Sequence, residues 1–400
     1  MRLWIIQLAL SAFSLASEQT QQVFDDQNAK QPPSAVTETI STPLFATLER
    51  LARLVDVTYC IGTTGVSKPF DCVSRCEDFP NISLVTTWNT GVLMSDSCGF
   101  IAVDHGSPEK SDPIYAGGPA IIVAFRGTYS ITNTVVDLST VPQKYVPYPS
   151  PDDGGEKPPE KPEHECTNCT VHMGFLSSWQ STRTLVVPQL RELKQQYPSY
   201  PIQLIGHSLG GAVACLASLE LKVSLGWEDV VVTTFGEPRV GNVGFIRFVD
   251  QVFHLNDQKD VEERTYRRVT HQEDPVPLLP MSEWGYNSHA GEIFIAKQDL
   301  SPTENDVRMC VGDEDPNCIA QADDNVWDFL SRMRRFVWKK GMALETDGLA
   351  KIAGFPSRLK LWQLFFAHRD YFWRLGLCVP GGDPANWGRN PYKPPASEDL

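Results

Sequence analysis

The chain has 400 residues, 42% of them hydrophobic, so it is long enough to bury a sizeable core, and this argues against an unfolded or fibrous protein. Its formal net charge of −14 creates an acidic field that repels phosphate backbones, which argues against nucleic acid as a partner. The length alone is compatible with one large domain or two.

Residues 1–17, MRLWIIQLALSAFSLAS, have the features of a secretory signal peptide. A short basic start precedes an apolar run from Leu3 to Leu15, and small residues stand where signal peptidase cuts. A membrane anchor is the weaker alternative, because a span needs about 20 apolar residues and no stop-transfer segment follows. Ten cysteines also suit an oxidising compartment. We therefore expect a secreted protein.

Two segments at the ends of the expected domain have the composition of mobile chain. Residues 18–42 are rich in Gln, Thr, Ser and Pro, which predicts a flexible leader or propeptide. Residues 381–400 are predicted to form a flexible tail rich in Pro and Gly. Between them, helical spacing of apolar residues begins in PLFATLERLARLVDVTYC, just after Pro43.

The body of the chain alternates strand-like runs with helical patterns. AIIVAFRG, IQLIG and DVVVTTFG read as strands, and the segments 175–196 and 209–221 read as helices. This alternation predicts an α/β fold with a mostly parallel sheet and helices on both faces. A Pro-rich charged stretch at 148–165 is expected to be a surface loop. Since the pattern resumes after it, we expect a single domain over residues 43–380.

Ser208 stands between Gly206 and Gly210 in the sequence IGHSLGGA, at the predicted junction of a strand and a helix. In a G-x-S-x-G elbow, a strained turn exposes the serine, and small flanking residues allow close packing of the backbone. The helix that begins beside the serine directs N–H groups toward a developing oxyanion. The structural alternative is a Gly-Ser turn without chemistry, but the strand before and the helix after the motif favour a nucleophile.

Five motifs, GHSLGGA, IIVAFRGT, GEPRVGN, DPVPLLP and HRDYFWRLGLC, together resemble the class 3 lipases of filamentous fungi and yeasts. This α/β-hydrolase family also contains feruloyl esterases. The likeness runs from about Leu44 to Cys378, and it departs at residues 148–165 and at about 320–363. It implies an α/β-hydrolase fold with a lid in one domain.

The order of catalytic residues in α/β-hydrolases is nucleophile, acid, histidine. Asp274 follows a strand-like segment, and the resemblance assigns it to the triad. The alternative is an ordinary Asp-Pro turn without a catalytic role. The neighbouring carboxylate, Glu273, is the residue to test against it. Chain order leaves His289 and His368 open, and only the resemblance favours His368 as the base. His207 is not expected to be the base, because adjacent residues in a turn point away from each other.

These residues predict hydrolysis of a carboxylic ester through an acyl-enzyme. Ser208 attacks the carbonyl, His368 transfers the proton, and Asp274 orients the imidazole. The N–H of Leu209 is one expected oxyanion donor. The resemblance assigns the second to Thr128, for which a turn-capping role is the alternative. No cofactor or metal is expected.

The resemblance also implies a set of disulfides, which pair Cys60 with Cys378, Cys72 with Cys76, Cys166 with Cys169, and Cys310 with Cys318. Cys98 and Cys215 are left over, and Cys215 is expected to be a buried free thiol. Two sequons, at Asn81 and Asn168, are candidate glycosylation sites. The second is less suited to glycosylation, because it lies close to cysteines.

Two further segments are candidate lipid contacts. The resemblance implies a lid helix over residues 129–138, where a small surface helix is the alternative. Residues 326–344 form a basic amphipathic pattern that includes Arg334 and Arg335. This pattern is compatible with a helix lying in a lipid interface, or with an ordinary helix packed on the core.

The expected function is that of a secreted triacylglycerol lipase that acts on lipid esters at an oil–water interface, without an obligate protein partner. A soluble carboxylesterase or feruloyl esterase has the same fold and triad, so it remains an alternative. A catalytically inactive binding protein is the least favoured alternative, because all three proposed triad residues are present.

Overall fold

The structure is a computed structural model that describes residues 39–91, 96–106, 118–128, 142–149, 165–256, 261–312, 315–322 and 366–394. The expected signal peptide, nearly all of the leader, the lid at 129–138, most of the loop at 148–165 and the basic helix at 326–344 lie outside these residues. Among the described helices, none has both the length and the apolar character needed to cross a membrane.

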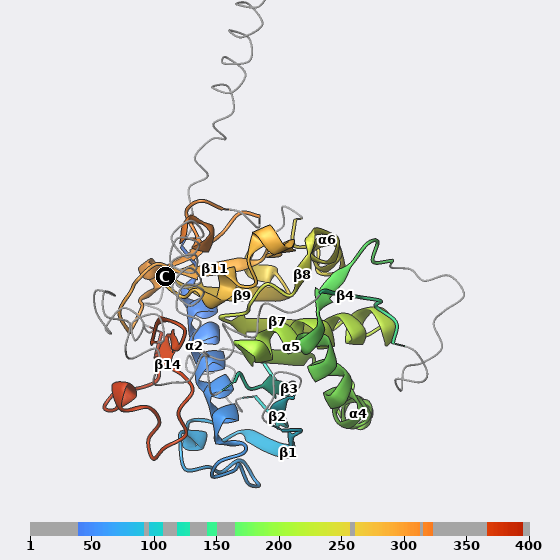
Figure 1. The fold of residues 1–400 in the computed structure, drawn as a ribbon. Helices are drawn as coiled ribbons and strands as arrows, with labels where there is room; N and C mark the ends of the chain where they lie inside the picture. Colours follow the sequence, from blue (N-terminus) through green and yellow to red (C-terminus); the bar gives the residue numbers. More distant parts are fainter. Residues whose placement is uncertain are drawn as a thin grey trace, which may run out of the picture. The chain divides into compact units, whose positions relative to one another are not determined.

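The main sheet has eight strands in the order β1-β2-β3-β6-β7-β9-β11-β12 (Figure 1). The strands from β3 to β11 run parallel to one another, and antiparallel strands flank them on both sides. The bounds are β1 Ile82–Asn89, β2 Cys98–Asp104, β3 Ala120–Phe125, β6 Ile202–His207, β7 Val230–Phe235, β9 Tyr266–His271, β11 Glu292–Ile295 and β12 Val307–Met309. The expected mostly parallel sheet is confirmed.

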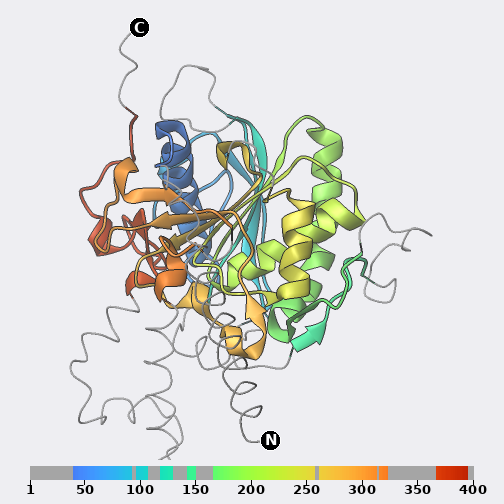
Figure 2. The ribbon, with the colours of Figure 1, turned by 90° about the horizontal axis from the view of Figure 1, so that it is seen from above.

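Helices cover both faces of this sheet (Figure 2). One face packs against α4 (Met173–Gln196), α5 (Leu209–Leu219) and α6 (Val243–Val252), and the other packs against α2 (Thr42–Asp56) and the C-terminal segment. The residues of β3 alternate between the two cores, because successive strand side chains point to opposite faces. Ile121 and Val123 belong to the first core, and Ile122 and Ala124 belong to the second.

A second, four-stranded sheet has the order β10-β8-β5-β4. Its strands are β4 Pro142–Lys144, β5 Thr170–His172, β8 Gly241–Asn242 and β10 Tyr286–Asn287. Since β8 lies shortly after β7, and β10 lies between β9 and β11, these strands extend the loops at the carboxyl ends of the parallel strands. This is the edge where α/β proteins place their ligands.

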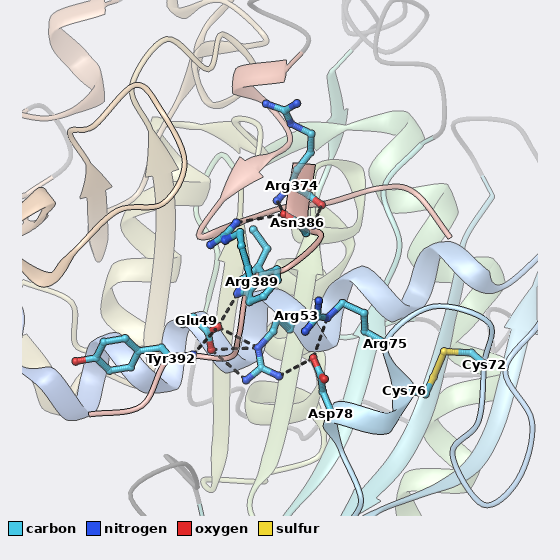
Figure 3. Close-up of polar contacts among 11 residues, drawn as sticks. Glu49, Arg53, Cys72, Arg75, Cys76, Asp78, Arg374, Asn386, Arg389 and Tyr392 are labelled. Atoms are coloured by element: carbon cyan, nitrogen blue, oxygen red, sulfur yellow. Dashed lines mark hydrogen bonds and ion pairs between the residues drawn. A yellow bond between two sulfur atoms is a disulfide. The ribbon is translucent and has the colours of Figure 1, made fainter. Parts of the chain in front are cut away.

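The C-terminal residues up to 394 are packed, whereas the sequence predicts a flexible tail from residue 381. After the short hairpin of β13 (Asp370–Tyr371) and β14 (Trp373–Arg374), the chain returns to α2 (Figure 3). Asn386 accepts a hydrogen bond from the Arg374 N–H at 3.0 Å, and the Tyr392 N–H donates to Glu49 at 3.3 Å. Composition alone misses this packing, because a few anchoring side chains hold a segment that is otherwise rich in Pro and Gly.

Candidate active site

Ser208 occupies a strained turn between β6 and α5. Its backbone has φ 57° and ψ −130°, a conformation that non-glycine residues rarely adopt and that tends to occur at functional sites. The Ser208 N–H donates to the Phe235 carbonyl at 2.9 Å, which ties the turn to the end of the neighbouring strand β7. The strand-turn-helix geometry expected around this serine is therefore present.

Two glycines make this turn possible. A Cβ atom on Gly206 would lie 2.2 Å from the Gly210 carbonyl oxygen, and one on Gly210 would lie 2.3 Å from the Phe125 carbonyl oxygen. Both contacts are with backbone atoms, which cannot rotate away, so a larger residue would push the helix off the sheet. The glycines thus let α5 begin directly against β3 and β6.

His368 and Asp274 form a buried hydrogen-bonded pair. The His368 Nδ1 atom lies 2.9 Å and 3.0 Å from the two carboxylate oxygens, and both side chains are inaccessible to solvent. The Tyr371 hydroxyl and the Val276 N–H also donate to this carboxylate. Burial by itself would raise the pKa of Asp274, but the interactions with His368 and these hydrogen bonds outweigh it, so the pKa lies below its usual value.

Since the carboxylate is an acceptor, Nδ1 of His368 carries the proton, and Nε2 keeps its lone pair when the ring is neutral. Both Nε2 of His368 and Oγ of Ser208 are buried, and neither hydrogen bonds to another atom of the described residues. A nucleophile and its base often lack a tight hydrogen bond in a structure without substrate.

His207 links the nucleophile turn to the histidine segment. Its Nε2 lies 2.8 Å from the His368 carbonyl oxygen and its Nδ1 lies 2.5 Å from the Tyr59 hydroxyl. Because a carbonyl only accepts, Nε2 donates, and Nδ1 accepts from Tyr59. Burial is the main cause that lowers the pKa of His207 to about 3, so the ring stays neutral and keeps this pattern. In accordance with the sequence analysis, His207 is not placed as the base.

The two expected oxyanion donors lie at the start of α5 and after β3. Leu209 is the first residue of α5, so the intrahelical ladder leaves its N–H without a partner. A Cβ atom on Gly127 would lie 2.8 Å from Cβ of Ser208, which brings the loop after β3 against the nucleophile turn. The half-buried Thr128 directly follows this contact.

The alternative triad residues lie elsewhere. His289 contacts Glu237, with Nε2 3.3 Å from Oε1, and Glu273 is exposed and accepts a hydrogen bond from Gln298. The hydroxyl groups of Tyr371 and Tyr59 complete the polar network, and no sequence motif predicts either role. Tyr371 stands three residues after His368 in the same motif, and this spacing is the only signal in the sequence that could have drawn attention to it.

The structure contains disulfides between the four pairs of cysteines that the resemblance implies. Cys60 and Cys378 connect the end of α2 and its following turn to the segment after His368. Cys98 and Cys215 are buried and unpaired among the described cysteines. Of the two sequon residues, Asn168 is exposed and Asn81 is half-buried.

The chain is similar to known fungal lipases. Residues 122–284 match the family model described as "Lipase (class 3)". The secreted mono- and diacylglycerol lipase 2 of Gibberella zeae is 69% identical over 365 residues, which cover 90% of this chain and 89% of the relative. Lipase A of Sodiomyces alcalophilus is 59% identical over 90% of this chain and 88% of its own length.

A similar fold occurs in the crystal structure of the Lip2 lipase from Yarrowia lipolytica. That chain superimposes with a TM-score of 0.65 at 29% sequence identity, and the match covers 86% of this chain and 99% of the other. The expected α/β-hydrolase fold is confirmed by this likeness.

Proposed function

Since the chain belongs to the class 3 lipase family and is a secreted lipase, we propose that it hydrolyses mono- and diacylglycerols with Ser208, His368 and Asp274. The observation that carries the chemistry is the arrangement of these residues. A strained serine starts a helix at the carboxyl edge of the sheet, and a buried histidine nearby is held by a carboxylate.

The choice of partial glycerides rests on the relatives. The lipase of Gibberella zeae, at 69% identity, and a 29% identical lipase of Penicillium cyclopium are both named for mono- and diacylglycerols. The family resemblance implies a triacylglycerol lipase and leaves a feruloyl esterase open. The name of the 69% identical relative supports partial glycerides over both alternatives.

In the proposed first step, the Ser208 hydroxyl attacks the ester carbonyl while Nε2 of His368 accepts its proton. Asp274 keeps the proton of His368 on Nδ1, so Nε2 is the free acceptor, and the carboxylate then stabilises the imidazolium that forms. The low pKa of Asp274 favours the ionised form that this role needs.

The negative charge that develops on the carbonyl oxygen would be stabilised by the N–H of Leu209 and by Thr128. His368 next gives its proton to the leaving glycerol oxygen, and the acyl group stays on Ser208. A water molecule, deprotonated by the same imidazole, then attacks the acyl-enzyme and releases the fatty acid. Both half-reactions use only protein groups and water.

The test is a side-by-side rate comparison with emulsified monoolein, diolein and triolein, and with methyl ferulate in solution. We expect hydrolysis of the mono- and diester to exceed hydrolysis of the triester by at least about tenfold, a difference of about 1.4 kcal/mol in transition-state binding. Equal or faster turnover of triolein would overturn the substrate proposal, and a preference for the ferulate would support the esterase alternative.

A further inference from the structure

A cluster of metal-ligand side chains lies behind the nucleophile helix, outside the proposed catalytic residues. Cys215 is on α5, Glu237 follows β7, and His289 lies between β10 and β11. All three are buried, with at most 3% of each residue exposed. Their Sγ, carboxylate and ring nitrogen atoms all lie within 4.8 Å of one another. Residues from distant parts of the chain thus converge on one small volume.

The hydrogen bonds of His289 show that a proton or a metal ion is needed between His289 and Glu237. Nδ1 lies 2.7 Å from the Ala290 carbonyl oxygen, so Nδ1 must be the protonated nitrogen. In the neutral ring, Nε2 is then an acceptor, yet it faces Oε1 of Glu237 at 3.3 Å. Two acceptors in a buried site repel each other unless a proton or a metal ion lies between them.

The other carboxylate oxygen of Glu237 is already saturated. Oε2 accepts hydrogen bonds from the Thr234 hydroxyl at 2.6 Å and from the Tyr266 hydroxyl at 2.9 Å. Among the described residues, Oε1 contacts only the His289 ring nitrogen. Two donors therefore hold Oε2, and Oε1 points to the site. Carboxylates that bind metal ions are commonly held by such hydrogen bonds.

We propose that Cys215, Glu237 and His289 bind a structural zinc ion. Sulfur, imidazole and carboxylate ligands are the set that Zn²⁺ takes, at about 2.3, 2.0 and 2.1 Å. Two ligands at about 2.0–2.1 Å in a tetrahedral arrangement lie about 3.3 Å apart, and Nε2 of His289 and Oε1 of Glu237 are 3.3 Å apart in the structure. The bond from Nδ1 to a backbone carbonyl is the usual orienting contact of a zinc-bound histidine.

The charges also balance when zinc is bound. Zn²⁺ displaces the proton of the Cys215 thiol to solvent and forms a Zn–S bond, so thiolate, carboxylate and metal sum to a neutral site. The Tyr266 hydroxyl, which donates to Glu237, lies beside the three ligands and holds the carboxylate in place. The ion would fasten α5 to the segments that follow β7 and β10.

The chain provides a matched control for each variant. Cys98 is the other buried free cysteine of the described chain, and its thiol donates to the Asn89 side chain at 2.9 Å. Cys98→Ser therefore removes a buried thiol outside the cluster. His254→Gln removes a histidine that is exposed and lies outside the cluster.

The experiment measures metal in the full secreted chain, expressed without a histidine tag in zinc-supplemented medium and purified without chelators. We expect about one equivalent of zinc per chain by mass spectrometry of the metal in the wild type, Cys98→Ser and His254→Gln. Cys215→Ser and His289→Gln should fall below about one tenth of an equivalent. Zinc-edge X-ray absorption of the wild type should show one sulfur at about 2.3 Å and lighter ligands at about 2.0–2.1 Å.

Two results would overturn the site. One is a wild type with less than about one tenth of an equivalent of zinc, which would leave a shared proton between Glu237 and His289. The other is undiminished zinc in Cys215→Ser and His289→Gln, or a first shell without sulfur. Because the absorption spectrum is recorded on the wild type, the test stands even if a variant fails to fold. None of these measurements depends on the proposed lipase activity.

Discussion

The nucleophile and the histidine of the candidate site are held in place in different ways. Ser208 lies within one continuous stretch of chain, where strand, turn and helix follow each other and two glycines allow the close packing. The segment around His368 is fixed by remote residues. His207 contacts it across 161 positions, Asp56 binds the Gly376 N–H across 320, and Cys60 is bonded to Cys378 across 318.

The position of Ser208 is thus determined mainly by neighbouring residues in the sequence, and the position of His368 by residues far away in the sequence. The nucleophile turn is encoded within one stretch of sequence, because the strand, the glycines and the helix carry most of its geometry. The base is positioned only after the first helix and the chain end have met. We therefore expect substitutions at the turn to abolish hydrolysis. Substitutions at the remote contacts should leave His368 in place but make its position less rigid.

The largest effect is expected for Ser208→Ala. Hydrolysis of diolein should fall on the order of 10⁵-fold or more, since the residual rate comes only from binding and the oxyanion donors. Labelling by an organophosphonate, detected by intact mass, should disappear while the circular dichroism spectrum is unchanged. Undiminished labelling would place the nucleophile elsewhere.

The next largest effect separates the two histidines. His368→Ala should lower the rate on the order of 10⁵-fold, because members of a triad act as a unit. His289→Gln should lower the rate of the folded protein less than about tenfold, since His289 does not contact the proposed triad. Reversed effects of the two variants would overturn the assignment of the base.

Removal of the long-range disulfide tests the remote anchor. The double variant Cys60→Ser with Cys378→Ser should lose on the order of 5 kcal/mol of stability, because the bond closes a very long loop. The Cys72–Cys76 disulfide closes a short loop, with a separation of 4, so Cys72→Ser with Cys76→Ser should lose only about 2 kcal/mol. Thermal unfolding measures both. An equal loss in the two double variants would show that loop length does not govern the effect.

Asp56 provides a pH-dependent test of the same anchor. Burial is the main cause that raises the pKa of Asp56 from 3.8 to about 7, so the folded protein keeps a proton that the unfolded chain loses. The stability from this proton is fully present below pH 3.8 and is lost as the pH rises through about 7.

Asp56→Asn should therefore be more stable than the wild type by up to about 4 kcal/mol at pH 8.5, and the difference should shrink steadily toward pH 4. Unfolding temperatures recorded from pH 4 to 9 measure it. Asp71→Asn, which removes an exposed carboxyl, controls for net charge. A pH-independent difference would mean that Asp56 stays ionised in the folded protein.

The smallest effect is expected for Tyr371→Phe, which removes one donor to Asp274. The value of kcat should fall about tenfold with little change in KM, because the carboxylate still holds the histidine but less rigidly. Loss of this donor should also raise the pKa of Asp274, so the activity should decline at a higher pH on the acidic side. Tyr286→Phe serves as the control, since it removes a buried hydroxyl that makes no hydrogen bond with the described part of the chain.

The sequence predicts the family, the mostly parallel sheet and the nucleophile turn, because each depends on local pattern. It leaves the histidine open between His289 and His368, since both follow Asp274 and nothing local distinguishes their partners. The contacts that separate them, to Glu237 in one case and to Asp274 in the other, join residues far apart in the chain.

Two other features cannot be predicted from the local sequence, because residues far apart in the chain form them. The proposed zinc site of Cys215, Glu237 and His289 combines a helix residue with two loop residues, and no short motif connects them. The packed segment after residue 380 depends on single anchors such as Arg389, whose guanidinium lies 4.2 Å from the centroid of the Trp373 ring and donates to the Phe372 carbonyl. Composition averages over such residues and therefore predicts a loose tail.

The long-range anchoring of His368 also sets the order in which the enzyme becomes competent during synthesis. Ser208 and Asp274 emerge from the ribosome well before His368, and Cys378 and Tyr392 emerge later still. A nascent chain can fold its nucleophile turn early, yet it holds no base until its last segment has returned to α2 and the disulfide to Cys60 has closed. With the proposed roles of Ser208 and His368, hydrolytic activity would therefore begin only after this segment has packed on α2 and the disulfide has closed.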